Sequence, residues 1–154
     1  MEGLPIWLVI RLCTDEPKVR DFYNKLDSLL ELSMDVIDDF AGEAKEVYRY
    51  NKWLNYGLPL QRCRELGFHE VIFDALDERT LELGELKSFC GLLFGSSPTL
   101  IPDPDTNWKV FIAYVEDALM HERLQWNPIT EKMAPWINLR VLNNVYGQGK
   151  CTIM

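Results

Sequence analysis

The sequence predicts an α/β fold, in which a small parallel β-sheet is built from a β-α-β-α unit and the C-terminal half is predominantly helical. Over residues 1–66, apolar β-branched runs alternate with amphipathic helical stretches, whereas residues 67–125 show helical periodicity. The chain has 154 residues, of which 47% are hydrophobic, and is long enough to bury one core. We therefore expect one α/β domain over residues 1–146, ending in a packed arm at 126–146, and a flexible tail at 147–154.

The first predicted strand is the apolar run at residues 4–13, whose continuous hydrophobic character is typical of a buried parallel strand. The segment at 14–17 favours the start of a helix, because Thr and Asp cap helix N-termini and Pro suits the first turn. Apolar residues then recur at three- and four-residue spacing: Val19, Phe22, Tyr23, Leu26, Leu29 and Leu30. We expect this stripe to lie on the sheet.

A second unit begins with the short apolar run at 33–38, and the acidic residues Asp38, Asp39 and Glu43 precede a helical stretch at 44–50. Acidic side chains favour the positive N-terminus of a helix. The order strand, helix, strand, helix implies two parallel strands joined by a right-handed crossover. Two parallel strands alone make a poor sheet, so we expect further strands from elsewhere in the chain, from a partner copy or from residues upstream.

The rest of the chain is predicted to be helical, because glycine residues end successive periodic runs. Helices are expected at 58–66, 69–77, 80–94 and 107–125, with a Pro-rich surface connection at 96–104. No further convincing strand is expected. Residues 126–137 mix tryptophan with proline, which favours an extended arm packed on the body.

The charge balance is acidic, with 16 Lys and Arg against 24 Asp and Glu and a formal net charge of -8. Such a chain repels phosphate backbones and anionic lipid headgroups, so no nucleic-acid partner is expected. The 4 cysteines form no C-x-x-C pair and lie in or beside apolar runs, which favours reduced thiols and a cytoplasmic location. The apolar run at 4–12 is too short to span a bilayer and lacks the features of a signal peptide.

The segment at 103–107 places oxygen ligands at the first, third and fifth positions of a calcium-binding loop. The pattern fails further on, because Trp108 stands where the turn needs Gly and Tyr114 stands where a bidentate Glu is needed. We expect Asp105 or Thr106 to cap the following helix instead.

Three acidic residues, Asp15, Asp38 and Asp39, follow the ends of the two predicted strands. Ligands and metals bind in the crevice beyond the carboxyl ends of parallel strands, and carboxylate oxygens suit a hard cation such as Mg²⁺. These residues form the candidate metal site, and a metal-dependent enzyme is the corresponding alternative function. The competing interpretation is that the three acids cap helices, in which case no cofactor is needed. No residue is assigned a catalytic role.

Residues 4–15, the helix after them and the strand at 34–38 resemble the later half of a von Willebrand factor A domain, and 58–65 is similar to the helical tail of some large intracellular relatives. The resemblance covers residues 4–66. It implies that Asp15 matches the acid that ends the family's fourth strand, near a divalent cation. The family's D-x-S-x-S motif and first three strands are absent, which implies a partial domain whose metal site is inactive unless another chain completes it. An exposed sheet edge would then invite a homodimer or a partner protein.

The sequence ends in Cys151-Thr152-Ile153-Met154, which fits the C-a-a-X box that directs farnesyl addition to the cysteine. Glycines at 147 and 149 are expected to form a flexible linker before the box. One lipid chain without a polybasic patch anchors weakly and reversibly, so peripheral membrane association is the most that we expect. The alternative is a chance match without lipid.

Together these features favour a non-enzymatic intracellular protein-interaction module, with the metal-dependent enzyme as the alternative. A third hypothesis is a small-ligand binder whose pocket is lined by aromatic side chains, although aromatic residues in a chain of this size are mostly core. The residues concerned are Trp53, Tyr56, Trp126 and Trp136.

Overall fold

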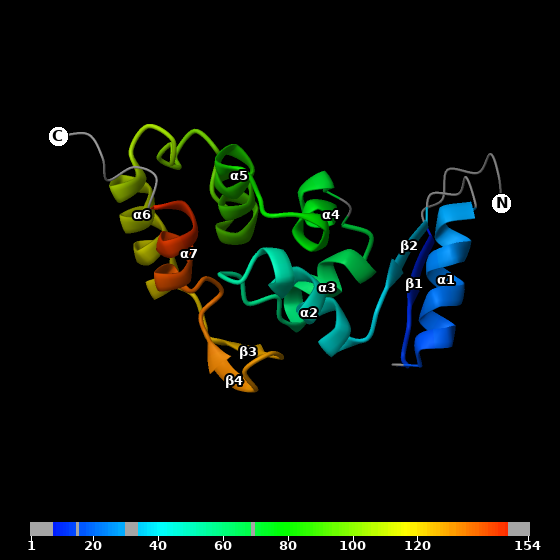
Figure 1. The fold of residues 1–154 in the computed structure, drawn as a ribbon. Helices are drawn as coiled ribbons and strands as arrows, with labels where there is room; N and C mark the ends of the chain where they lie inside the picture. Colours follow the sequence, from blue (N-terminus) through cyan, green and yellow to red (C-terminus); the bar gives the residue numbers. More distant parts are fainter. Residues whose placement is uncertain (1–7, 15, 30–33, 69, 148–154) are drawn as a thin grey trace.

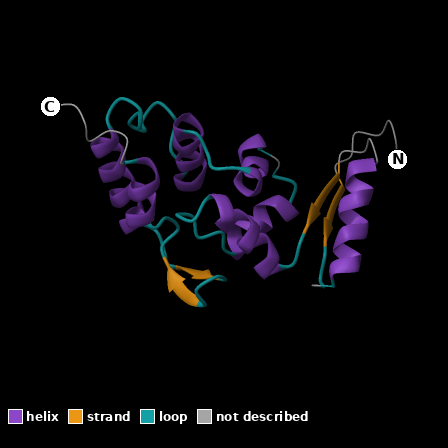
Figure 2. Cartoon of the chain, viewed as in Figure 1, coloured by secondary structure: helices purple, strands orange, loops and turns teal. Residues whose placement is uncertain are grey.

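The computed structural model describes residues 8–14, 16–29, 34–68 and 70–147, and its helices outweigh its strands (Figures 1 and 2). The elements in chain order are β1 (Leu8–Arg11), α1 (Pro17–Leu29), β2 (Met34–Ile37), α2 (Phe40–Tyr50), α3 (Leu58–Glu65), α4 (Val71–Glu78), α5 (Leu83–Phe94), α6 (Trp108–Met120), β3 (Gln125–Asn127), β4 (Lys132–Ala134) and α7 (Leu139–Tyr146). The predicted fold class, a small parallel sheet with a mostly helical C-terminal half, is confirmed.

The β1-α1-β2 unit forms one end of the molecule, beside α2 and α3 (Figure 1). Its strands run parallel, as predicted, with Leu8 opposite Met34 and Arg11 opposite Ile37. The ladder extends one residue further, because the Leu12 amide donates to the Ile37 carbonyl at 2.8 Å. Among the described residues this sheet contains β1 and β2 alone, so it is narrow.

Helix α1 covers the sheet with only part of its apolar stripe. Val19, Tyr23 and Leu26 are partly buried. Phe22 and Leu29 are 60% and 74% exposed, so the prediction that the whole stripe lies on the sheet is wrong for these two residues. A two-stranded sheet is narrower than the apolar arc of the helix, which leaves one side of that arc uncovered.

Helix α2 begins at Phe40, earlier than the sequence predicts, because Asp39 caps it. The Asp39 carboxylate accepts from the amides of Ala41 and Gly42 at 2.8 and 3.0 Å. A Cβ atom at Gly42 would lie 2.9 Å from Oδ2 of Asp38. Any larger residue here would have to displace the Asp38 side chain, so glycine suits this close approach of α2 to the end of β2.

The core lies in the helical part of the molecule and is organised around residues 51–57, which follow α2. Trp53, Leu54 and Tyr56 of this segment are almost completely buried. Its backbone pairs with a distant segment, since the Asn55 amide donates to the Trp136 carbonyl and the Asn138 amide donates to the Trp53 carbonyl, both at 2.8 Å. The core residues are joined through long-range contacts that the helical periodicity does not specify.

The segment 126–146, expected as an extended arm, instead forms the antiparallel β3-β4 hairpin and helix α7. The expectation of no further strand is therefore wrong. The carboxamide of Asn127 accepts from the amides of Ile129 and Thr130 and closes the hairpin turn, while Asn138 caps α7 by accepting from the Val141 amide. These strands have three residues each, which is too short for an alternating pattern to be visible in the sequence.

Several helix boundaries also differ from expectation, and α5 begins at Leu83 rather than at 80. Helix α6 ends at Met120 rather than at 125, and its N-cap is Asn107, which accepts from the Val110 amide. Asp105 and Thr106 are therefore not its caps; their amides instead donate to Oδ1 of Asp103 in a turn. No helix in the described ranges is long and apolar enough to cross a membrane.

Candidate functional site

A cleft of about 510 Å³ lies where the carboxyl ends of β1 and β2 meet α2 and α3, the position at which the sequence predicts a ligand crevice. Its lining includes Leu12, Cys13, Asp39, Phe40 and Arg62. The cleft therefore combines apolar surface with a carboxylate, a guanidinium and an exposed thiol.

The three predicted metal ligands have different positions. Asp15 lies outside the described residues. Asp39 uses its carboxylate to cap α2, in agreement with the capping interpretation. Asp38 is buried at 6% exposure, and its Oδ2 lies 3.7 Å from Nη1 of Arg20 on α1. Within the part of the chain that the structure describes, no three His, Cys, Asp or Glu side chains are grouped so that they could hold a metal ion. A role for Asp15 with another chain stays a prediction.

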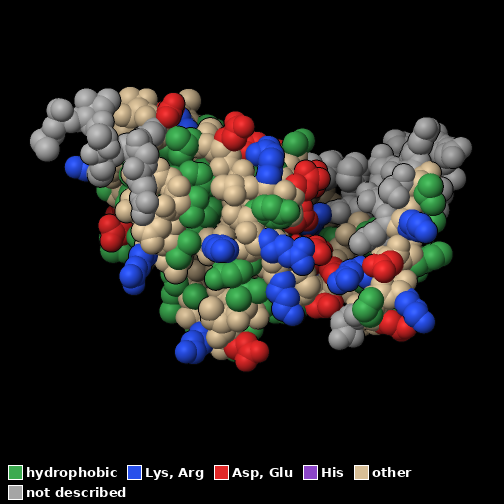
Figure 3. Space-filling model, viewed as in Figure 1, with side chains coloured by type: hydrophobic (Ala, Val, Ile, Leu, Met, Phe, Trp, Pro, Cys, Tyr) green, Lys and Arg blue, Asp and Glu red, His purple; other side chains and the backbone are tan. Residues whose placement is uncertain are grey.

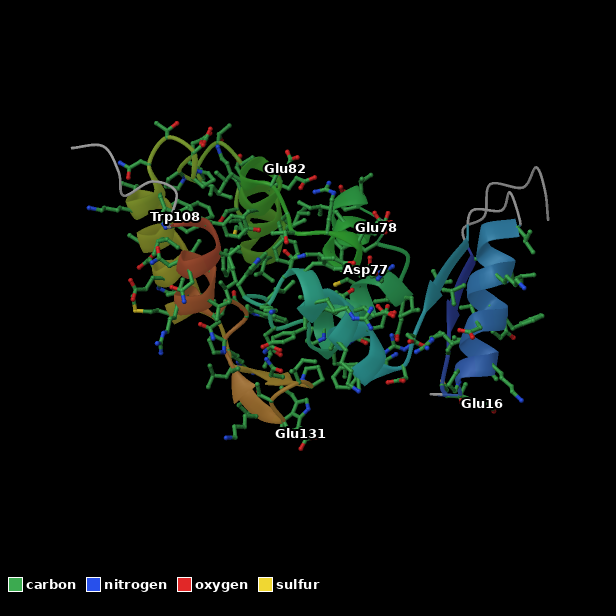
Figure 4. The ribbon with its side chains drawn as sticks, viewed as in Figure 1. Glu16, Asp77, Glu78, Glu82, Trp108 and Glu131 are labelled. Carbon is green, nitrogen blue, oxygen red and sulfur yellow. The ribbon has the colours of Figure 1, made fainter. Side chains whose placement is uncertain are left out.

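A buried ionic cluster joins the β1-α1-β2 unit to the helices, and the sequence interpretation missed it. Nη1 of Arg64 on α3 donates to Oε2 of Glu43 on α2 at 3.2 Å and to Oδ2 of Asp77 on α4 at 3.4 Å. Oε1 of Glu43 accepts from the Asp38 amide at 2.7 Å, at the end of β2. Figure 4 shows Asp77 on α4, close to α3. Glu43 thus connects the sheet to the guanidinium of α3.

Burial shapes the electrostatics of this cluster. Loss of hydration raises the pKa of Glu43 to about 7, although the Arg64 guanidinium opposes the rise. Burial likewise raises the pKa of Asp77 to about 6, again against the effect of Arg64. The pKa of the Tyr56 hydroxyl, which lies near Arg64, is raised by burial as well, so Tyr56 stays neutral. Two carboxylates with raised pKa values therefore share one guanidinium.

A second polar connection runs from β1 to α3. Nη2 of Arg11 donates to Oε1 of Gln61 at 2.7 Å, and Nε of Arg11 lies 3.2 Å from Oε1 of Glu65. Gln61 is completely buried, and its amide nitrogen donates to the carbonyls of Phe40 and Tyr56 at 3.0 and 3.3 Å. Both strands of the sheet are therefore held to the helices by buried polar groups.

Sequence spacing contains no signal for this cluster. Glu43 and Arg64 are 21 residues apart, and Arg64 and Asp77 are 13 residues apart, so each helix contributes a single charged residue. A charged residue on the apolar side of each helix is the only trace that such a cluster leaves in a sequence.

The four aromatic residues proposed to line a pocket do not converge. Trp53 lines a groove of about 530 Å³ bordered by α6, the β3-β4 hairpin and α7. Trp136 lines a separate apolar pocket of about 310 Å³ beside α3, α4 and α5. Tyr56 is buried in the core, and Trp126 is 47% exposed on the hairpin. The four aromatic residues therefore do not form one shared ligand pocket, and the groove beside Trp53 is the remaining basis for the ligand-binder hypothesis.

Hydrophobic side chains are also exposed at the end of the molecule formed by the β1-α1-β2 unit (Figure 3). They include Phe22 and Leu29 of α1 and Leu8 of β1, which is 36% exposed. Cys151 lies outside the described residues, so its lipidation stays a prediction.

No protein-family model matches the chain, and no curated protein or solved structure matches it. The resemblance of residues 4–66 to a von Willebrand factor A domain therefore rests on the sequence pattern alone.

Proposed function

We propose that the chain is a non-enzymatic protein-interaction module whose docking surface is the β1-α1-β2 unit, and that its partner adds an extended strand to the sheet. One observation carries this proposal. The described sheet has two strands, so each strand has one paired edge and one edge that no described strand pairs. Such an edge presents backbone N–H and C=O groups in the arrangement that an added strand uses.

The exposed side chains of the unit support the same surface. Phe22 and Leu29 lie seven residues apart on one side of α1, and both are more than half exposed. Burying one such side chain stabilises a complex by roughly 1.5–3 kcal/mol. A partner strand at the sheet edge, with side chains that reach α1, would cover these residues.

The unit is also held in place before a partner binds. Glu43 connects the end of β2 to the helical body through a buried hydrogen bond, and Gln61 connects β1 to it through a partly buried one. A docking surface that is ordered in advance loses less conformational entropy on binding. The helical core then has the role of a rigid support.

The unpaired edge of β1 can be tested by one substitution. Because the Leu12 amide faces β2, alternation along the strand places the Val9 amide on the opposite edge. Val9→Pro removes that donor and leaves the bonds to β2 intact. The matched variants are the double substitution Phe22→Ser with Leu29→Ser, and a control, Val110→Ser, at a 49% exposed position on α6.

The probe is a set of decapeptides selected from a random display library on the full chain. We expect Val9→Pro and the α1 double variant to weaken peptide binding about tenfold or more, which corresponds to about 1.4 kcal/mol, and Val110→Ser to leave it unchanged. Sedimentation of the chain alone identifies a second copy as the partner if a dimer is seen and Val9→Pro dissociates it. Equal binding to all variants, with no dimer, contradicts the proposal.

The C-terminal box adds a reversible membrane tether to this proposal. Intact-mass measurement after expression in eukaryotic cells tests it. We expect a farnesylated Cys151 that is lost in Cys151→Ser. An unmodified terminus with all four residues present contradicts the tether and leaves the docking surface unaffected.

The groove bordered by α6, the hairpin and α7 favours a second candidate, a binder of small apolar ligands. Its lining combines Trp53, Leu119 and Ile137 with the polar side chains of Asn138 and Lys52. Apolar walls with a few polar groups are typical of ligand sites. Thermal-shift screening with apolar fragments tests this candidate, and Leu119→Trp, which fills the groove, should abolish any shift that occurs there.

A further inference from the structure

The groups around Arg64 are unbalanced in charge. Four carboxylates and three guanidiniums interact across this region, from the residue after β2 and from α1, α2, α3 and α4. The carboxylates are those of Asp38, Glu43, Glu46 and Asp77, and the guanidiniums are those of Arg20, Arg49 and Arg64. Tyr56, which also lies in this part of the described structure, is neutral. Among these seven described charged groups, the carboxylates outnumber the guanidiniums by one when all are ionised.

We propose that Glu43 and Asp77 take up one shared proton across Arg64, and that this uptake tightens the attachment of the β1-α1-β2 unit to the helical body. The proton comes from solvent and binds one of the two carboxylates. The other carboxylate stays ionised and keeps its ion pair with Arg64. This inference concerns the fold and does not depend on the docking function proposed above.

The position of Glu43 explains how proton binding to this cluster can affect the attachment of the sheet to the helices. Glu43 is 4% exposed in its side chain and contacts two elements at once, since Oε2 accepts from Arg64 while Oε1 accepts from the Asp38 amide. Arg64 is 6% exposed in its side chain, so water does not screen the pair well. The Asp77 side chain is 22% exposed, so water already reaches one side of the cluster. An excess charge on Glu43 is relieved when more water reaches it, which requires α2, α3 and the end of β2 to move apart.

The direction of the effect follows from the pKa values. The pKa of Glu43 rises from 4.5 to about 7 on burial, so the closed state binds a proton more tightly than an opened state does. The pKa of Asp77 rises in the same direction, to about 6. The stabilisation is complete below the ordinary pKa values, 4.5 for Glu43 and 3.8 for Asp77, and is lost as the pH rises through about 6 to 7. The attachment is therefore tighter at pH 6 than at pH 8.

Amide hydrogen exchange of the full chain tests this inference, with rates corrected for the intrinsic effect of pH. The reporters are the amides of Asp38, bonded to Glu43, and of Leu12, bonded to β2. The amide of Asn55, bonded to Trp136 inside the helical body, is the internal reference. For a group whose pKa is about 7, we expect the opening constant at Asp38 and Leu12 to rise about tenfold between pH 6 and pH 8 relative to Asn55.

Matched variants assign the effect to the pair. Glu43→Gln and Asp77→Asn each remove one carboxylate and should reduce the pH dependence to less than threefold. Glu78→Gln removes an exposed carboxylate from the same helix as Asp77 and should leave the tenfold change intact. An opening constant in the native chain that does not change between pH 6 and pH 8 overturns the inference, whether or not the variants fold. A tenfold change that persists in both Glu43→Gln and Asp77→Asn also overturns it.

Discussion

Nη1 of Arg64 lies 3.2 Å from Oε2 of Glu43, and both side chains are more than nine-tenths buried. The pair joins α2 to α3 while the second oxygen of Glu43 holds the backbone at the end of β2. Buried ion pairs add little to stability relative to apolar packing, but removing one partner leaves the other unpaired at a large cost. The consequences of substitution at this cluster should therefore be asymmetric.

Replacing Arg64 with methionine should destabilise the chain in a pH-dependent way. At pH 8 we expect a loss of about 3 kcal/mol, because Glu43 and Asp77 lose the guanidinium that offsets their burial and must either stay charged or take up protons from a solution that holds few. At pH 5.5 both acids can protonate, so the loss should be smaller. Urea denaturation at the two pH values measures the difference. Arg62→Met is the control, because Arg62 lies on the same helix with a 63% exposed side chain and should change stability by less than about 0.5 kcal/mol at either pH. Equal losses for both variants would contradict the role of the cluster.

The stability of the native chain should fall as the pH rises from 5 to 8. Burial raises the pKa of Glu43 to about 7, of Asp77 to about 6 and of Glu46 in the same direction, so the Glu43–Asp77 pair and Glu46 bind protons more tightly in the folded state than in the unfolded state. Their contribution is complete below the ordinary pKa values, 4.5 for Glu and 3.8 for Asp, and disappears as the pH rises through about 6 to 7. The partly exposed Glu85 contributes with the opposite sign, since its hydrogen bond with Arg79 lowers the pKa of Glu85 to about 2. Its stabilisation is present above pH 4.5 and is lost only as the pH falls toward 2, outside the range from 5 to 8. Thermal denaturation between pH 4 and 9 tests this, and a midpoint that rises steadily to pH 8 would show that the sign is wrong.

Asn51 should be among the most sensitive polar positions in the chain. Its side chain is completely buried and makes hydrogen bonds with the carbonyls of Leu76 and Arg79 and with the amide of Leu81. Asn51→Ala leaves these backbone groups without partners, and we expect a loss of about 2–4 kcal/mol. Asn107→Ala, which removes the cap of α6, should cost only about 1 kcal/mol in the same denaturation experiment. A smaller loss at Asn51 than at Asn107 would contradict the proposed role of Asn51 in joining α2 to the segment after α4.

Two glycine-to-alanine substitutions should have opposite effects. In Gly42→Ala the new methyl group would meet Oδ2 of Asp38 at 2.9 Å and its Cγ at 3.2 Å, so the buried Asp38 side chain, α2 or the end of β2 must shift. We expect a loss of about 1–2 kcal/mol. In Gly84→Ala no atom lies within 4 Å of the new methyl group, and the helix preference of alanine should give a gain of about 0.5 kcal/mol. Denaturation midpoints measured side by side decide whether the approach of α2 to β2 is as close as the structure indicates.

Local sequence patterns were sufficient to predict those helices and strands that are marked by one amphipathic stripe or one continuous apolar run. The apolar run before Pro17 predicted β1 and the start of α1. The acids after β2 predicted a helix N-terminus nearby, although α2 begins four residues earlier than expected, after its cap Asp39. The hairpin and α7 were not predicted. Their pairing, such as Trp126 opposite Met133, and their contacts with the segment 51–57 depend on residues distant in the sequence.

For the candidate metal site, too, the sequence predicted the positions of residues along the chain but not their partners in space. The sequence correctly placed Asp38 and Asp39 at the carboxyl end of β2, because alternating strands and helices fix where parallel strands end. It could not show that Asp38 lies beside Arg20 or that Asp39 bonds to the amides of α2. Those partners depend on how closely α1 and α2 approach the sheet.

The sequence by itself determined the parallel β-α-β unit, the existence of most helices and the acidic character of the chain, because these follow from periodicity, capping residues and composition. The tertiary structure alone decided that the described sheet has two strands, that Phe22 and Leu29 of α1 stay exposed, and that Glu43, Arg64 and Asp77 form one buried cluster. The physical reason is that a residue's spacing within its own helix fixes the face on which it lies, whereas its neighbour across that face is set by the packing of other elements.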